Sequence, residues 1–232
     1  MRREQEGEKM KKRLVLFWGL ISILICVSVV AGIFYKLNVQ DCGLAKLAHV
    51  SDLEGMAVTL DYAWGSRDED ILEMDNDMSE APIIAIIIPT GQVSQSNGSI
   101  SQEFKVSTII RGKEYISEEQ TSYLYQPFGF VPKDGTIVFM NTLNLMESQE
   151  QYIAFLSPSP LNGRMSNSAY IPYSSLFAYV KISREETPSL PTNYRDIQFS
   201  DLTKYEFFST SDKVTEYLNS ERKEILNIFL SQ

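Results

Sequence analysis

The most continuous apolar feature of the chain is the run from Leu14 to Phe34, which contains 21 residues and no charge. Fourteen of them are Leu, Ile, Val or Phe. A helix of this length spans about 31 Å at a rise of about 1.5 Å per residue, close to the hydrocarbon thickness of a bilayer. Trp18 and Tyr35 stand near its two ends, where interfacial aromatic residues are common. The pattern predicts a single transmembrane helix over residues 14–34.

The charges that flank this run predict its direction. Residues 1–13 carry six basic side chains, whereas only Lys36 and Lys46 follow within about 15 residues of the run. The excess of positive charge predicts a cytoplasmic tail at 1–13 and an extracytoplasmic remainder in a single-pass protein of the cell membrane. The alternative is a signal peptide cut after Ala31, because Val29-Val30-Ala31 resembles a cleavage site. The length of the run exceeds a usual signal-peptide core and favours an uncleaved signal-anchor.

Beyond a mixed stretch at 35–55, which we interpret as a stalk, the pattern changes to short strands. Ile83–Ile88 is apolar throughout and bounded by prolines, as is typical of a central strand. Asn97-Gly98 is a strong hairpin signal, and residues 102–110 alternate apolar and polar side chains. Arg111-Gly112-Lys113 reads as a turn. The strands predicted in this way cover residues 56–62, 83–88, 102–110, 122–126, 136–140, 151–156 and 177–182.

Two stretches are predicted to be helical. The acidic run 68–80 predicts a short helix with a solvated face, and residues 212–230 predict an amphipathic C-terminal helix with Val214, Leu218, Ile225 and Phe229 on one face. The expected fold is therefore mainly β (α+β). It comprises an antiparallel barrel of about six strands at 56–186, followed at 187–232 by an extended segment and the C-terminal helix.

A family resemblance rests on two motifs in the β region: Phe104-x-Val106 leading to Ile110-x-Gly112-Lys113, and the strand 151–156 (QYIAFL). Over about residues 82–182 the chain resembles uncharacterised, membrane-anchored surface proteins of Gram-positive bacteria that carry an OB-like barrel. It is more distantly similar to the tissue inhibitors of metalloproteinases and to netrin-like modules. Those inhibitors use an N-terminal cysteine in a disulfide-tied domain. This chain has only Cys26 and Cys42, so the resemblance implies the fold and not the inhibitory mechanism.

Composition narrows the chemistry. The chain has 21 basic and 30 acidic residues, of which six and three lie in 1–13, so the remainder carries a net charge of −12. Such a body repels phosphate backbones, and we expect no nucleic-acid partner. The one histidine, His49, excludes sites that need two. Asp75 and Asp77 have the spacing of a calcium loop, but Glu80 replaces the required glycine. We therefore expect no metal, no cofactor and no catalytic residue.

A group of aromatic residues is the candidate binding surface. Tyr123, Tyr125, Phe128 and Phe130 cluster around Pro127, and alternating tyrosines on a strand form a platform for a ligand. A second group, Tyr170, Tyr173, Phe177 and Tyr179, has the same composition, and for both groups packing in the barrel core is the alternative. The sequence thus predicts a non-catalytic module that binds a surface protein or envelope component. The alternative is an extracytoplasmic hydrolase with an unidentified Ser-Lys or carboxylate site.

Overall fold

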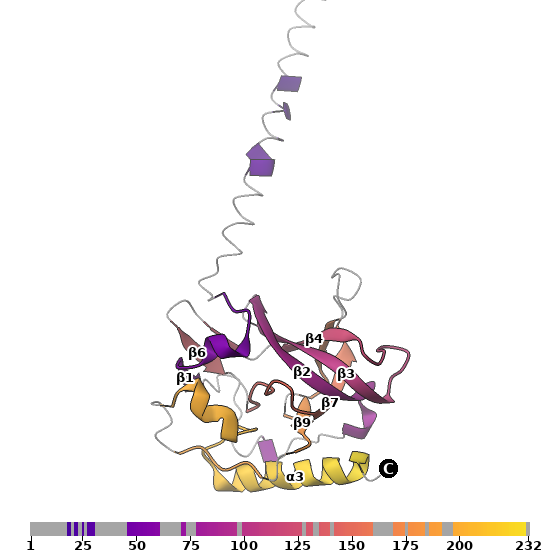
Figure 1. Cartoon of the computed structure of the whole chain (residues 1–232). Helices are drawn as coiled ribbons and strands as arrows, with labels where there is room; N and C mark the ends of the chain where they lie inside the picture. The colour runs from indigo at the N-terminus through magenta and orange to yellow at the C-terminus, as the bar shows by residue number, and fades with distance from the viewer. Residues whose placement is uncertain are drawn as a thin grey trace, which may run out of the picture. The chain divides into compact units, whose positions relative to one another are not determined.

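The computed structural model describes residues 18–19, 21–22, 25, 27–30, 46–60, 71–72, 78–96, 99–126, 129–131, 135–139, 142–159, 169–174, 176–183, 186–191 and 197–230. The chain divides into two compact units, residues 1–42 and residues 43–232. The second unit is called the body. Its elements are labelled in Figure 1.

The described residues of the first unit, which all lie between 18 and 30, are helical. The Ser22 hydroxyl donates to the Trp18 carbonyl oxygen at 3.0 Å, four residues earlier, as is usual for a serine within a helix. Most of the predicted span 14–34 lies outside the described residues. In the part of the chain that the structure describes, no helix is both long and apolar enough to cross a bilayer.

The body is mainly β and contains a closed barrel of five strands, as the short alternating segments predicted. The strands are β2 (Ile83–Ser96), β3 (Ser99–Arg111), β4 (Thr121–Gln126), β8 (Ala169–Pro172) and β7 (Tyr152–Pro158), in that order around the ring. The ring closes because β2 also pairs with β7, from Ile83 opposite Leu156 to Ile87 opposite Tyr152. A sixth strand, β9 (Tyr179–Lys181), pairs with the first half of β7.

The prediction that the barrel is antiparallel is wrong at one position. β4 and β8 run parallel, with Tyr123 opposite Ala169 and Leu124 opposite Tyr170, so the barrel is mixed. Alternation of polar and apolar residues is the same in parallel and antiparallel strands, and therefore the sequence pattern carried no sign of this pairing. β8 itself, only four residues long, was not predicted.

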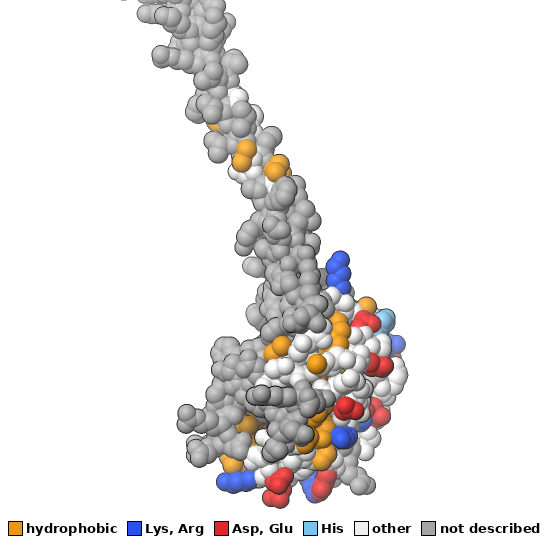
Figure 2. Space-filling model, turned by 90° about the vertical axis from the view of Figure 1, so that its left-hand side faces the viewer, with side chains coloured by type: hydrophobic (Ala, Val, Ile, Leu, Met, Phe, Trp, Pro, Cys, Tyr) orange, Lys and Arg blue, Asp and Glu red, His pale blue; other side chains and the backbone are white. Residues whose placement is uncertain are grey.

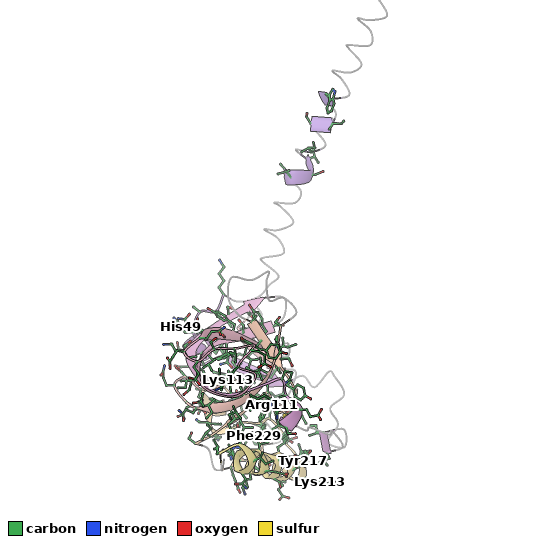
Figure 3. The ribbon with its side chains drawn as sticks, turned by 90° about the vertical axis from the view of Figure 1, so that its right-hand side faces the viewer. His49, Arg111, Lys113, Lys213, Tyr217 and Phe229 are labelled. Carbon is green, nitrogen blue, oxygen red and sulfur yellow. The ribbon has the colours of Figure 1, made fainter. Side chains whose placement is uncertain are left out.

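The interior of the barrel is mainly apolar. In the first half of β2, Ile83, Ile84, Ala85 and Ile87 are all fully buried, so both faces of this strand are covered, which explains its apolar run. Phe104 of β3 and Tyr170 of β8 meet inside, with ring centroids 6.2 Å apart. The strands form a ring above the C-terminal helix when the molecule is viewed from the right-hand side of Figure 1 (Figure 3).

A smaller sheet stands beside the barrel with a core of its own. It contains β1 (Ala57–Leu60), β6 (Thr136–Phe139) and β5 (Gly129–Phe130), in that order, and β1 and β6 are parallel. Two short 3₁₀ helices, η1 (Val50–Leu53) and η4 (Phe199–Lys204), contribute buried apolar side chains to this second core. A third, η2 (Met78–Glu80), precedes β2 and adds Met78 to the barrel core. Ile71 and Leu72 are helical, within the predicted acidic helix 68–80; Ile71 is buried in the same core and Leu72 packs against it.

The C-terminal helix α3 spans Asp212–Leu230, as predicted from its apolar stripe. It lies along one side of the body (Figure 1), where Val214, Leu218 and Ile225 join the barrel core. Tyr217 and Phe229, labelled in Figure 3, pack against the same core at its margin. The stripe also contains Arg222, which is fully buried although it is charged.

The segment that enters the body is fixed to it from Ala48 onward. Val93 donates its backbone N–H to the Ala48 carbonyl oxygen at 3.0 Å, and His49 forms an antiparallel bridge with Gln92. One Asp52 carboxylate oxygen accepts from the backbone N–H of His49 at 2.9 Å and of Ala48 at 2.8 Å. Within the stretch 35–55, residues 48 and 49 are therefore bonded directly to β2.

We expect this attachment to weaken in acid. The N–H groups of His49 and Ala48 lower the pKa of Asp52, so the carboxylate supports the turn fully above its ordinary pKa of about 3.9 and loses that role as the pH falls through the lower folded value. Amide exchange of residues 48 and 49 should accelerate below about pH 4, relative to its intrinsic rate. In D52N this pH dependence should vanish, whereas an unchanged profile in the variant would contradict the assignment.

Candidate functional site

The outward surface of β3 and β4 gathers the polar and aromatic groups of the candidate site. Leu124 of β4 is buried in the barrel, so its neighbours Tyr123 and Tyr125 point to the opposite, outer face. The pairing of the two strands places Glu103 opposite Tyr123 and Ser101 opposite Tyr125. Tyr123, Tyr125 and Glu103 are all half-buried on this surface. We call these three residues the outer face.

The Glu103 carboxylate is held by two hydroxyl groups. The Tyr123 hydroxyl donates to Oε2 at 2.7 Å, and the Thr90 hydroxyl donates to Oε1 at 2.9 Å. Each bond joins a charged acceptor to a neutral donor, which is stronger than a bond between neutral groups. The carboxylate is therefore fixed in position at the surface with both oxygens oriented.

Thr90 reaches Glu103 because β2 is irregular at this point. The register between β2 and β3 shifts between Pro89 and Val93, which places Thr90, Gly91 and Gln92 in a bulge. Gly91 has φ +88°, a conformation that favours glycine, and a Cβ built on it would lie 3.0 Å from the Ser148 Oγ. The bulge turns the Thr90 hydroxyl back over the neighbouring strand, where it meets the carboxylate.

Tyr125 contributes an aromatic surface with a neutral hydroxyl. Burial raises the pKa of its phenol above the ordinary value of about 10, so the group stays protonated at any physiological pH. Beside it, the hydroxyls of Ser94 and Ser101 lie 2.8 Å apart and form a hydrogen bond. The strand surface next to the tyrosine is therefore closed by small polar groups.

Of the four residues predicted as a binding surface, the structure describes three, and they lie in two different sheets. Tyr123 and Tyr125 share the outer face, as their spacing implied. Phe130 belongs to β5 in the smaller sheet, and Phe128 lies outside the described residues. Glu103 and Thr90 were not singled out, although the alternation of 102–110 already placed Glu103 on the polar face of its strand.

The second aromatic group is largely structural. Tyr170, Phe177 and Tyr179 are buried in the barrel core, and only Tyr173 is exposed. The Tyr170 hydroxyl donates to the Tyr115 carbonyl oxygen at 2.8 Å, and the Tyr179 hydroxyl donates to the carbonyl oxygen of Asn144. The alternative interpretation of this group as core packing is therefore correct for three of its four members.

A second polar cluster joins β9 to α3. Arg222 Nε donates to Glu206 Oε2 at 3.0 Å, and both side chains are buried, with 1% and 5% of their residue surfaces exposed. The same pair completes the free edge of β9, because Glu206 accepts from the Lys181 backbone N–H at 2.6 Å and Arg222 donates to the Lys181 carbonyl oxygen at 2.7 Å. Two side chains thus take the place of a neighbouring strand.

The side chain of Lys181 extends the cluster. Its Nζ lies 2.9 Å from Glu147 Oε2 and 3.6 Å from Glu150 Oε1. A cavity of about 10 Å³ beside it is lined by Asn144, Leu145, Glu147, Tyr152, Tyr179, Lys181, Tyr205 and Glu206. This volume admits at most about one water molecule, so the cluster is a structural junction with no room for a substrate.

Neither a metal-binding cluster in the described part of the chain nor a similarity to a known protein assigns a function to the chain. Among the described residues, no three His, Cys, Asp or Glu side chains gather in a way that would hold a metal ion. Neither the models of known protein families nor the curated proteins give a match to the sequence. The class that the structure defines is therefore a mainly β protein with a closed, mixed five-stranded barrel and a C-terminal helix.

Proposed function

We propose that this protein is a membrane-tethered, extracytoplasmic binding module without catalytic activity, whose ligand surface is the outer face of Glu103, Tyr123 and Tyr125. The observation that carries the proposal is the Glu103 carboxylate, held at the surface by two hydroxyls beside two tyrosine rings. Ordered charged groups next to half-exposed tyrosines are typical of recognition surfaces, because the groups lose little entropy on binding.

The barrel topology supports an OB-like fold, in agreement with the resemblance to Gram-positive surface proteins. β2, β3 and β4 follow one another around the ring, and the fourth barrel strand in the chain, β7, returns to pair with β2. This order, fourth strand beside first, is a Greek key, and a five-stranded Greek-key barrel is the architecture of the OB fold. In such barrels ligands bind over the second and third strands, which are β3 and β4 here.

The tether rests on the apolar run 14–34 and on the character of its described residues. Trp18, Ile25, Val27, Val29 and Val30 are helical and expose more than half of their surface, Trp18 and Val27 the most at 60%. Apolar side chains in this region are visible in Figure 2. A helix that presents such residues to its surroundings is stable in lipid, because its backbone is satisfied internally.

The direction of the tether is tested by labelling. A cysteine introduced at Lys213, which is exposed on α3, should react with a membrane-impermeant maleimide in intact cells, and one at Glu8 should react only after lysis. Both variants carry C42S, so that Cys42 does not contribute. Equal labelling of the two cysteines in intact cells, or labelling of Glu8→Cys alone, would reject the proposed orientation.

The binding surface is tested by site-specific crosslinking in native membranes. A photoreactive phenylalanine analogue at Lys105, which is exposed next to Glu103 on β3, should capture a component of the outer surface. The same analogue at Lys213 on α3 is the matched control and should capture nothing. The proposal fails if adducts form equally at both positions or at neither, while both variants reach the membrane.

A further inference from the structure

We propose that the outer face binds an arginine side chain of a partner protein, an inference that rests on the proposed binding function and gives its ligand class. Three features of the described surface carry it. They are a fixed carboxylate that has no cation beside it, the acceptor positions left on its two oxygens, and an opening next to it along the same pair of strands. The acidity of the chain acts in the same direction.

Glu103 differs from two other fixed carboxylates of the body. The buried Glu206 pairs with Arg222 at 3.0 Å, and Glu147 pairs with Lys181 at 2.9 Å. Glu103 is held instead by two neutral hydroxyls, and none of the ion pairs between described residues includes it. A carboxylate that is partly withdrawn from water is stabilised by an opposite charge. Its hydrogen bonds fix the charge without neutralising it, so a cation from a partner completes the site.

The two hydrogen bonds leave the carboxylate matched to a guanidinium group. An ionised carboxylate offers about four lone-pair positions, two on each oxygen. The Tyr123 hydroxyl occupies one on Oε2 and the Thr90 hydroxyl one on Oε1, so each oxygen keeps one. An arginine donates two parallel N–H groups to the two oxygens of one carboxylate, whereas a lysine ammonium acts as a point charge. The geometry therefore favours arginine over lysine.

The outer face is open on one side of Glu103. Ser101, two residues before it, is 2% exposed, so the strand surface is closed in that direction. Lys105, two residues after it, lies opposite Thr121 of β4, and both are exposed. An arginine therefore reaches the carboxylate from the side of Lys105 and Thr121. There its planar guanidinium lies next to the half-buried Tyr123, whose ring attracts a cation.

The charge of the chain favours a cationic partner. Beyond residue 13 the net charge is −12, so a basic protein segment is attracted at long range and a polyanion is repelled. Lys105 opposes this attraction locally, because it lies on the same face as Glu103, two residues or about 7 Å along the strand. Its removal should therefore strengthen the binding of an arginine, which supplies a variant with an effect of opposite sign.

The test compares labelled hexaarginine and hexalysine, by fluorescence anisotropy, on the full chain in phosphatidylcholine nanodiscs, with empty nanodiscs as the blank. Hexaarginine should bind at least about threefold more tightly than hexalysine. E103Q should weaken hexaarginine about tenfold, because it replaces a charged acceptor with a neutral one, and should bring the two peptides to similar affinities. K105Q should strengthen hexaarginine by about two- to threefold.

Two controls separate a specific site from general attraction to an acidic protein. E216Q removes one exposed carboxylate on α3 and is matched to E103Q in charge. It should change the affinity for hexaarginine by less than about twofold and keep the preference over hexalysine. Y123F keeps the charge of Glu103 but removes one of the two hydroxyls that orient it, and should reduce that preference. Folding of each variant is checked by circular dichroism.

Each outcome decides one of the two proposals. Equal affinities of the two peptides for the unaltered chain, or equal effects of E103Q and E216Q, overturn the arginine assignment. Binding of spermine, a polyamine without a guanidinium group, that E103Q weakens as much as it weakens hexaarginine also overturns it. If crosslinking at Lys105 still captures a component specifically, the binding function stands and its ligand is of another class. If neither peptide binding that depends on Glu103 nor crosslinks are found, both proposals fall.

Discussion

Replacing Arg222 with methionine is expected to lower the free energy of unfolding by about 3–5 kcal/mol, because it strands a buried charge. The substitution keeps most of the side-chain volume but leaves the Glu206 carboxylate buried without its cation. It also removes the donor that satisfies the Lys181 carbonyl oxygen on the edge of β9. Urea unfolding of the full chain in nanodiscs, followed by pulse proteolysis, measures the change.

A double variant distinguishes a lost charge pair from lost packing. In R222M/E206Q the unpaired charge is gone, and the glutamine still accepts from the Lys181 backbone N–H, so we expect it to recover a large part of the lost stability. K223M, which removes an exposed cation one residue further along α3, is the control and should cost at most about 1 kcal/mol. If R222M behaves like K223M, the buried pair does not hold α3 to the barrel.

Replacing Gly112 with alanine is expected to destabilise the barrel by about 2–5 kcal/mol, for two reasons that add. Its φ is +88°, where a side chain costs about 1–2 kcal/mol. A Cβ there would also lie 2.6 Å from the Pro82 carbonyl oxygen and 3.0 Å from the Ile83 Cα. These are backbone atoms at the start of β2, so the strand itself would have to shift.

Gly135 provides a control matched in conformation. It has φ +83°, but a Cβ built on it meets no described atom within 4 Å. G135A should therefore cost only the conformational strain of about 1–2 kcal/mol. The difference between the two variants isolates the contact with β2, and equal losses would show that the close approach is not important. Thermal unfolding of both variants under one condition gives this difference.

The sequence predicted those parts of the fold that depend on local pattern. The boundaries of α3 agree because its stripe and its first residue are both local signals, and the apolar run in β2 correctly indicated a strand with neighbours on both sides. The charge within the stripe is Arg222. Glu221 is half-buried beside the stripe, and burial and the nearby Glu224 raise its pKa.

The parts that could not be predicted depend on pairing between distant residues. The parallel contact of β4 with β8 joins segments that are separated by the whole of β7. The alternation of polar and apolar residues is the same in parallel and antiparallel strands, so it does not indicate the direction of pairing. For the same reason, the sequence predicted Tyr123 and Tyr125 of the candidate site but not Glu103 and Thr90. Two tyrosines on one strand share a face by local geometry, but the Thr90 hydroxyl reaches Glu103 only through a bulge, and a bulge leaves no clear sign in the pattern of β2.

The closed ring has a consequence for the order in which the chain is made. Ile83 pairs with Leu156, 73 positions later, and the edge of β9 is completed by Arg222, which follows Lys181 by 41 positions. β2 is synthesised long before β7, with which it closes the ring. Its edge on the β7 side therefore stays unpaired, and its apolar side chains stay exposed, until β7 has been made. Chains interrupted before residue 222 keep an unsealed strand and an incomplete core. Proteases and chaperones therefore have a physical criterion by which to tell truncated chains from finished ones.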